Sequence, residues 1–324
     1  MHSIFEKFNS LNILIIGDAM MDSYVWGKIE RVSPEAPVPV VQVTKKENRL
    51  GGAANVALNV QSLGANPIIC AVIGDDQEGM ELSRLMDNAH LSKEGILTVR
   101  DRPTTVKTRI IAHNQHIVRV DAETDTNIPT DSVRLFQERI ADIITEQNIH
   151  AIIFEDYDKG LISEELITFV VNLANQKNII TAVDPKKRNF LFYKDVTLFK
   201  PNLKELREGL KTEVDPFSIT QIESTVDLLR EKLNVKSIML TLSEHGVFIS
   251  TAKEHKLLPA HIRTIADVSG AGDTVIATAA VCLAAGLDEF ESAAIANLAG
   301  GLVCEQVGVV PIDKGRLLKE ALLL

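Results

Sequence analysis

The chain has 324 residues, of which 45% are hydrophobic and 24% are charged, as expected of a folded protein with a sizeable core. Its net charge of −10 argues against nucleic-acid binding, which usually requires a basic face, but leaves phosphate binding open where amides or lysines converge. Three cysteines without a C-x-x-C spacing argue against a zinc or dithiol site. No signal core opens the chain, and its apolar runs are shorter than the roughly 20 apolar residues of a bilayer span, so we expect a cytoplasmic protein without a membrane partner.

Taken in chain order, apolar runs of strand length alternate with helical patterns. We predict strands at 11–16, 68–73, 151–154, 179–183 and 237–241, and helices at 53–63, 78–88, 131–147, 164–175 and 275–285. Each predicted strand is nearly all apolar, as in a strand that is covered on both faces. This alternation predicts an α/β fold in which a parallel sheet lies between helices.

Two further segments interrupt the alternation. A short strand at 38–43 follows a proline-rich stretch, and strands at 105–112 and 117–120 form a hairpin that turns around 113–116. We interpret these pieces as a small projecting sheet, a lid with segments at about 23–49 and 98–121, although extra edge strands on the main sheet fit the pattern equally well. Neither a repeat nor a linker divides the sequence, so we expect a single domain over 1–324.

The most informative segment, 267–274, reads Asp-Val-Ser-Gly-Ala-Gly-Asp-Thr and leads directly into a helical pattern. Gly270, Ala271 and Gly272 can present backbone N–H groups without side-chain obstruction, and the positive end of the helix dipole adds to them. Together they are suited to a transferring phosphoryl group, and a carboxylate at Asp273 could accept a proton from an attacking hydroxyl. The alternative is that the glycines only shape the turn and that Asp273 caps the helix.

Two common nucleotide-binding motifs do not occur in the sequence. The Walker A pattern G-x-x-x-x-G-K-[ST] is missing, which disfavours a P-loop NTPase. The first predicted strand ends in Gly17-Asp18 rather than in G-x-G-x-x-G, which disfavours an NAD-dependent oxidoreductase.

The order and spacing of three motifs resemble those of the ribokinase-like, or PfkB, family of sugar kinases. The motifs are Gly51-Gly52-Ala53-Ala54-Asn55, Pro201-Asn202-x-x-Glu205 and Gly270-Ala271-Gly272-Asp273, within a resemblance that runs from about 12 to 311. It implies a ribokinase-like α/β fold, a central mostly parallel sheet flanked by helices with a projecting β-sheet lid. It also implies an ATP-dependent carbohydrate kinase, a phosphotransferase with an alcohol group as acceptor.

Within this family the chain is most similar to members that phosphorylate D-glycero-β-D-manno-heptose 7-phosphate at O1, giving the 1,7-bisphosphate, a precursor of lipopolysaccharide. The stretches that carry this similarity are 17–22, 31–40 and 49–55. Such kinases are often fused to a nucleotidyltransferase; because this chain ends at Leu324, we expect a kinase that stands alone. The alternatives are a kinase for a hexose, a fructose phosphate or a nucleoside, which lid residues such as Glu35, Arg109 and Asn114 should discriminate, and a catalytically silent nucleotide-binding scaffold.

Four residues depart from the family's pattern in the region expected near the phosphates. Glu155 and Asp158 stand where serine and alanine are common, Lys187 where glycine is frequent, and Lys200 where a small polar residue is usual. These departures leave the kinase class intact and bear on the details of phosphate binding.

The resemblance implies a role for each matching position. Asp273 would be the general base, and Gly270, Ala271 and Gly272 would form the anion hole. The positions expected to bind the sugar phosphate are Asp18, Asp22, Gly51, Gly52, Asn55, Lys107, Arg109 and Arg119. Turn residues, a helix contact and scattered surface bases remain the structural alternatives for these positions.

The nucleotide and metal positions follow from the same resemblance. The expected nucleotide contacts are Lys186, Asn202, Thr241, Ser243, Gly246 and Asn297, with purely structural roles equally open for Ser243 and Asn297. Asn202 and Glu205 would organise Mg²⁺ through water, because this ion tends to keep part of its hydration shell. Asp267 and Val268 are candidates for a monovalent cation such as K⁺. A polar-faced lid often pairs with a second copy, so we also expect a homodimer.

Overall fold

Within residues 1–113, 115–261 and 263–324, which the computed structural model describes, the strands form a nine-stranded sheet and a separate four-stranded sheet. The nine-stranded sheet has the order β13-β12-β11-β10-β9-β8-β1-β4-β5 and is parallel from β5 to β11. Its strands are β1 (Asn12–Gly17), β4 (Asn66–Gly74), β5 (Ser92–Val99), β8 (Ala151–Glu155), β9 (Ile180–Asp184), β10 (Leu198–Phe199), β11 (Ser237–Thr241), β12 (Val247–Thr251) and β13 (His255–Leu258). All five strands predicted in the apolar runs are present, and β12 and β13 add an antiparallel edge.

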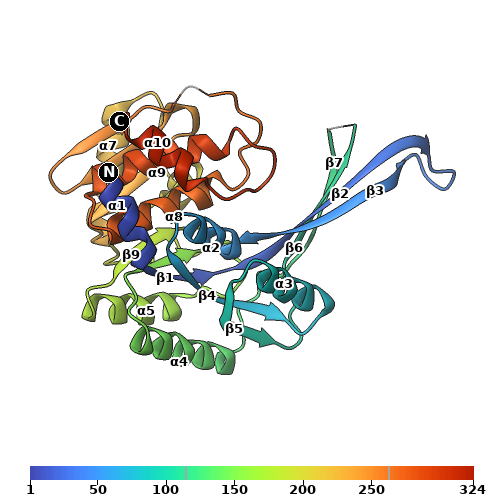
Figure 1. Ribbon diagram of the computed structural model, residues 1–324, viewed down its shortest axis with the longest axis horizontal. Coiled ribbons are helices and arrows are strands. Elements are labelled where there is room, and N and C mark those ends of the chain that lie inside the picture. The colour runs from blue at the N-terminus through green and yellow to red at the C-terminus, as the bar shows by residue number, and fades with distance from the viewer. Residues whose placement is uncertain (114, 262) are drawn as a thin grey trace.

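Helices cover both faces of this sheet, as the apolar strands require (Figure 1). One face packs against α1 (His2–Lys7), α2 (Ala53–Ser62), α3 (Gln77–Asn88), α8 (Ala271–Ala284), α9 (Glu289–Val303) and α10 (Lys314–Ala321). The other packs against α4 (Thr130–Glu146), α5 (Glu164–Gln176), α6 (Leu203–Leu210) and α7 (Ile219–Leu233). Successive residues of β1 alternate between the two cores, Ile13 and Ile15 on one side and Leu14 and Ile16 on the other. In the described part of the chain no helix combines the length and the apolar character that crossing a bilayer would take.

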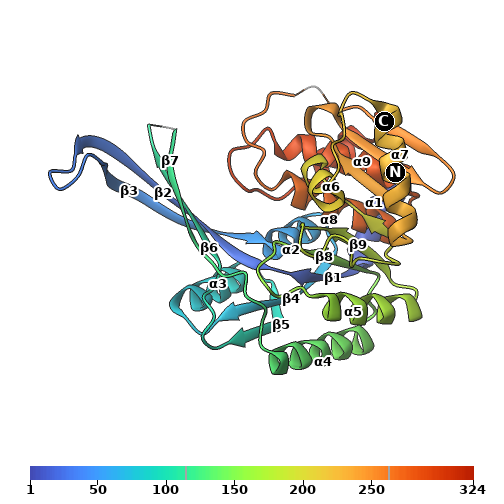
Figure 2. The same cartoon turned by 180° about the vertical axis from the view of Figure 1, so that it is seen from behind.

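The four-stranded sheet, which we call the lid, projects from one side of the body as two long ribbons (Figures 1 and 2). It has the order β3-β2-β6-β7, with β2 (Ala19–Val32), β3 (Pro39–Gly52), β6 (Val106–Ala112) and β7 (Gln115–Ala122). The projecting sheet and the β6–β7 hairpin are therefore confirmed, and the edge-strand alternative for these segments is wrong. The short strand predicted at 38–43 is part of the 14-residue β3, which pairs with an equally long β2 that the apolar pattern did not reveal. Thr98 and Val99, at the start of the second predicted lid segment, belong to β5 of the main sheet.

The carboxyl ends of the parallel strands meet at one edge of the main sheet, where the chain places polar residues. Asp18 follows β1, Glu155 and Asp184 end β8 and β9 in register with each other, and Lys200 follows β10. In parallel α/β sheets this edge is where ligands bind.

Candidate active site

The Gly-Ala-Gly turn forms the N-terminus of α8, which begins at Ala271, earlier than the apolar pattern predicted. Gly270 is the N-cap in the left-handed region, with φ 79°, and a Cβ there would lie 3.0 Å from the side-chain Nδ2 of Asn55. The positive φ favours glycine at this position, and any side chain would also crowd Asn55. Asp273 lies in the first turn of α8 and is 6% exposed, so its carboxylate is held at the positive end of the helix.

Two side chains from distant parts of the chain hold the Asp273 carboxylate. Asn55 Nδ2, on α2, donates to Asp273 Oδ2 at 2.7 Å, and the Tyr157 hydroxyl donates to Oδ1 at 3.0 Å. Burial raises the pKa of Asp273 to about 6; the hydrogen bond from Asn55 opposes this rise and the neighbouring Asp184 adds to it. A fixed, desolvated carboxylate with this pKa is suited to accept a proton near neutral pH.

The β3–α2 junction places Asn55 against the turn. Gly52 has φ 57°, and a Cβ on it would lie 2.3 Å from the carbonyl oxygen of Asp18, so only glycine fits. One helical turn further, Asn59 Oδ1 accepts from the Thr274 hydroxyl at 3.0 Å. Helix α2 is thus locked to α8 next to the candidate base.

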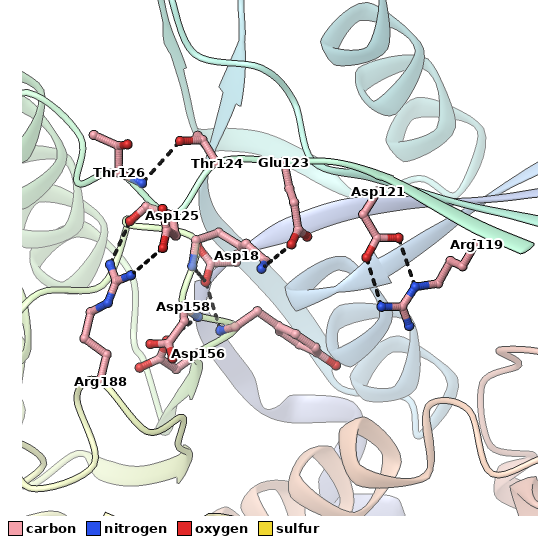
Figure 3. A network of polar contacts seen from close by, with 12 residues as sticks. Asp18, Arg119, Asp121, Glu123, Thr124, Asp125, Thr126, Asp156, Asp158 and Arg188 are labelled. Carbon is pink, nitrogen blue, oxygen red and sulfur yellow. Dashed lines mark hydrogen bonds and ion pairs between the residues drawn. The ribbon is translucent and has the colours of Figure 1, made fainter.

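Asp18 is buried beside the loop that follows β8. Its Oδ2 accepts from the backbone N–H groups of Tyr157 at 2.9 Å and Lys159 at 3.2 Å, and Figure 3 shows it against this loop. Burial, together with the nearby Asp156, raises the pKa of Asp18 to about 6. Tyr157 therefore contacts Asp18 through its backbone and Asp273 through its side chain. Tyr157 was not among the predicted site residues, although it follows a buried parallel strand.

The lid brings its basic residues toward Asp22 and Tyr157. Arg109 Nη1 lies 2.5 Å from Asp22 Oδ1, and the Lys107 ammonium lies 5.3 Å from the centroid of the Tyr157 ring. Both residues are on the same face of β6, because they are two positions apart on the strand. Gly51 leaves room for this arrangement, because a Cβ on it would lie 2.3 Å from Asp22 Oδ2.

Arg119 and the residues that follow β7 form a separate polar network (Figure 3). Arg119 pairs with Asp121 at 2.9 Å and is largely exposed, so it joins neither Lys107 beside Tyr157 nor Arg109 beside Asp22. Further along the chain Glu123 pairs with Lys159 at 2.9 Å and Asp125 pairs with Arg188 at 3.1 Å. These pairs attach the end of the lid to the body beside the Tyr157 loop.

A cavity of about 870 Å³ extends from Asp273 along the carboxyl edge of the sheet. Its lining brings together the predicted anion hole and most of the residues predicted to bind nucleotide and metal: Gly270, Ala271 and Gly272 of the anion hole, and Lys186, Asn202, Glu205, Thr241, Ser243, Gly246, Val268 and Asn297. Asn297 Nδ2 also donates to the Pro259 carbonyl at 2.9 Å, which is a structural contact. Asn114, one of the predicted discriminating residues, lies outside the described residues.

Charged side chains alternate along the floor of this cavity. Lys200 Nζ lies 2.8 Å from Asp184 Oδ2, Lys186 Nζ lies 3.9 Å from Asp184 Oδ1, and Lys186 also hydrogen-bonds to Glu205. Burial disfavours the charged form of Lys186, but Asp184 and Glu205 outweigh burial and hold its pKa above the usual value. Two of the departures from the family's pattern, Lys200 and Glu155, are buried, and Lys200 lines the cavity.

The residues predicted for Mg²⁺ are preorganised by a helix cap. Asn202 Oδ1 accepts from the Glu205 N–H at 2.8 Å, and the Glu205 carboxylate accepts from the Asn202 N–H at 2.9 Å. Among the residues that the structure describes, no three His, Cys, Asp or Glu side chains are arranged to hold a metal directly. The side-chain oxygens of Asn202 and Glu205 at the cavity wall suit a hydrated Mg²⁺, because this ion retains several waters and takes few protein ligands.

The predicted monovalent-cation residues lie beside the start of α8. Asp267 Oδ1 accepts from the Ser269 N–H and Oδ2 from the Gly308 N–H, each at 2.9 Å, while Val268 is exposed. Burial acts to raise the pKa of Asp267, but these hydrogen bonds outweigh burial and lower it. The carboxylate is therefore charged and fixed.

Comparison with known proteins gives one consistent result. The sequence profile described as pfkB family carbohydrate kinase matches residues 10–314. The chain is 38% identical to the bifunctional protein HldE of Magnetococcus marinus over 99% of the chain and 67% of that protein. It is 39% identical to the bifunctional protein HldE of Helicobacter pylori strain HPAG1 over 91% of the chain and 63% of that protein. The chain thus spans about two thirds of the length of these curated relatives.

Solved structures with much lower sequence identity share the fold. Escherichia coli phosphofructokinase-2, crystallised with potassium, superposes with a TM-score of 0.77 at 16% identity and covers 97% of this chain and 98% of its own. Arabidopsis thaliana ribokinase, in complex with ribose and ATP, gives a TM-score of 0.73 at 17% identity and covers 96% and 98%. These similarities confirm the predicted α/β architecture with its lid.

Proposed function

Because this chain belongs to the pfkB family of carbohydrate kinases, we propose that it transfers the γ-phosphoryl group of ATP to O1 of D-glycero-β-D-manno-heptose 7-phosphate. The observation that carries the proposal is the buried Asp273 carboxylate, fixed by Asn55 and Tyr157 where the anion-binding turn meets the long cavity. Support for the heptose comes from the motifs around 17–22, 31–40 and 49–55 and from the identity of 38% and 39% to HldE proteins.

The proposed reaction follows from the position of Asp273 between the lid and the cavity. Asp273 takes the proton of the O1 hydroxyl as that oxygen attacks the γ-phosphorus, and the bond to the β,γ-bridging oxygen breaks, releasing ADP. The N–H groups of Gly270, Ala271 and Gly272 stabilise negative charge on the transferring group. Asn202 and Glu205 would hold a hydrated Mg²⁺, which would supply charge neutralisation for the phosphates.

The sugar phosphate lies, in this proposal, between Asp18, Asn55 and the lid. Charged acceptors such as Asp18 make strong hydrogen bonds to sugar hydroxyls. Lys107 is the best placed cation for the distal phosphate, because Arg109 is already paired with Asp22 and Arg119 with Asp121. Burial lowers the pKa of Lys107, and a bound phosphate would compensate for this desolvation.

The proposal also covers the nucleotide site, the monovalent-cation site, the compartment and the oligomeric state. The nucleotide occupies the cavity along Lys186, Thr241 and Gly246, and K⁺ binds beside Asp267 and Val268. We place the enzyme in the cytoplasm, where its three buried free cysteines stay reduced. Its active form is a homodimer.

The test is an ADP-release assay with Mg-ATP and the heptose 7-phosphate, run beside fructose 6-phosphate, fructose 1-phosphate and ribose. We expect selective turnover of the heptose, with ³¹P NMR showing a new phosphate on the anomeric carbon. Faster turnover of another sugar would keep the kinase and refute the heptose. If no sugar is turned over although Mg-ATP binds, the scaffold alternative replaces the proposal.

A further inference from the structure

Lys200 is a buried cation whose position the family's motifs do not explain. It stands where relatives commonly carry a small polar residue, and it is 2% exposed. A buried charge is costly unless it is paired, and Asp184 provides the pair at 2.8 Å.

The sheet register places this ammonium beneath the anion-binding turn. Phe199 is in register with Val183, so Lys200 follows β10 beside Asp184 at the end of β9. Lys200 shares its side of the sheet with Leu198, which belongs to the core that contains α8. A Cβ on Gly272 would lie 3.6 Å from Asp184 Oδ2 and 3.9 Å from Lys200 Nζ, so both members of the pair lie next to this position in the first turn of α8.

A purely structural role leaves part of this arrangement unexplained. Asp184 already has a second cation, Lys186, at 3.9 Å, so it would not be left unpaired without Lys200. An ammonium has three N–H donors, and the contact with Asp184 occupies only one of them. The side chain also lines the same cavity as Gly270, Gly272 and Asp273.

We propose that Lys200 is a further catalytic residue, whose ammonium contacts the γ-phosphoryl group during transfer, and that Asp184 is the positioning residue that holds it there. Lys200 keeps its proton throughout: the sugar proton goes to Asp273, and ADP leaves with the electrons of the broken P–O bond. The cation adds to the charge stabilisation that the amides of the turn provide. This inference rests on the proposed kinase function, but not on the identity of the sugar.

The experiment compares Lys200→Met and Lys200→Gln with the parent protein and with Lys204→Met, a matched loss of an exposed lysine on α6. Binding of Mg-ADP and of the non-hydrolysable analogue Mg-AMP-PNP is measured by calorimetry, because only the analogue carries a γ-phosphate. Turnover and KM are measured with the best sugar found in the panel above. We expect the preference for AMP-PNP over ADP to fall about tenfold and kcat at least about a hundredfold, as for other transition-state donors, with the sugar KM little changed.

Several results would overturn the inference. One is a folded Lys200 variant with kcat within threefold of the parent; another is an equal loss of affinity for ADP and AMP-PNP, which indicates a structural role. Lys200→Gln keeps a donor for Asp184, so it tests the charge even if Lys200→Met does not fold. If the parent turns over no sugar, the proposed function fails, whereas an AMP-PNP preference that Lys200→Gln abolishes would still support the phosphate contact.

Discussion

At the scale of single residues, the protonation of Asp273 should determine how activity depends on pH. Its pKa is raised to about 6, and a base works only when deprotonated, so kcat/KM should rise through about pH 6 and level off above pH 7. Asp18, whose pKa is also raised to about 6, is an acceptor that works best when charged, so the acid limb can be steeper than for one proton. A pH profile of kcat/KM checks this; activity that is flat between pH 5 and 7 would contradict it.

Replacing Asp273 by Asn should separate catalysis from nucleotide binding. The amide keeps the size of the side chain but cannot take a proton, so we expect at least about a hundredfold loss of kcat with ATP affinity retained. Asp288→Asn is a matched control, because Asp288 caps α9 and asparagine is an equally good cap. Steady-state kinetics beside calorimetric ATP titration decide the question; kcat of Asp273→Asn within a few-fold of the parent would remove Asp273 from the role.

How far the sequence predicts the site differs from residue to residue. The turn at 270–273 and Asn55 could be predicted from the sequence, because their residue types and spacing indicate a chemical role by themselves. Tyr157 was not predicted and Lys200 was noted only as a departure from the family's pattern, because their closeness to the turn depends on which strands are neighbours in the sheet. Asn55 and Asp273, 218 positions apart, touch only because α2 and α8 pack side by side on the same face.

At the scale of elements, five buried strands of the main sheet were predicted within a few residues, since an unbroken apolar run of that length fits a strand covered on both faces. The buried β12 was not predicted. β2 escaped prediction because it passes from the buried core into the exposed lid, so no single periodicity describes its 14 residues. β10, with two residues, is too short for any pattern. The residues at the junctions between such elements indicate the site more clearly than the strand patterns do.

Gly52, at the β3–α2 junction, should therefore respond more strongly to alanine than another glycine of similar conformation. Gly52→Ala combines positive φ with a contact of 2.3 Å to the Asp18 carbonyl, whereas Gly286, with φ 96°, has nothing within 4 Å. We expect Gly286→Ala to lower the free energy of unfolding by about 1 kcal/mol and Gly52→Ala by several times as much, with a raised sugar KM because Asp18 is displaced. Denaturant unfolding and sugar kinetics measure both effects. Equal losses for the two variants would show that the crowding at Asp18 has no consequence.

At the scale of the whole molecule, the lid has two chemically different faces. Arg109 opposite Arg119 and Lys107 opposite Asp121 form a charged face that includes the candidate substrate residues. The intervening pairs place Val118 opposite Ile110 and Val120 opposite Thr108 on the other face, where both valines are about half exposed. An exposed apolar face on a projecting sheet, such as the one with Val118 and Val120, is suited to pair with a second copy.

We therefore expect the protein to be a dimer at micromolar concentration and Val118→Ser/Val120→Ser to be a monomer, because the double change removes much of the apolar area exposed on that face. Leu228→Ser is the matched control, since Leu228 is at least as exposed but lies on α7, away from the lid. Sedimentation velocity of the three proteins tests this expectation. If the parent sediments as a monomer, or if the double variant remains a dimer, the apolar face of the lid is not the interface. If the double variant is a monomer with a raised sugar KM and unchanged ATP affinity, then pairing also holds the lid in position over the sugar, because the substrate residues lie on the opposite face of the same strands.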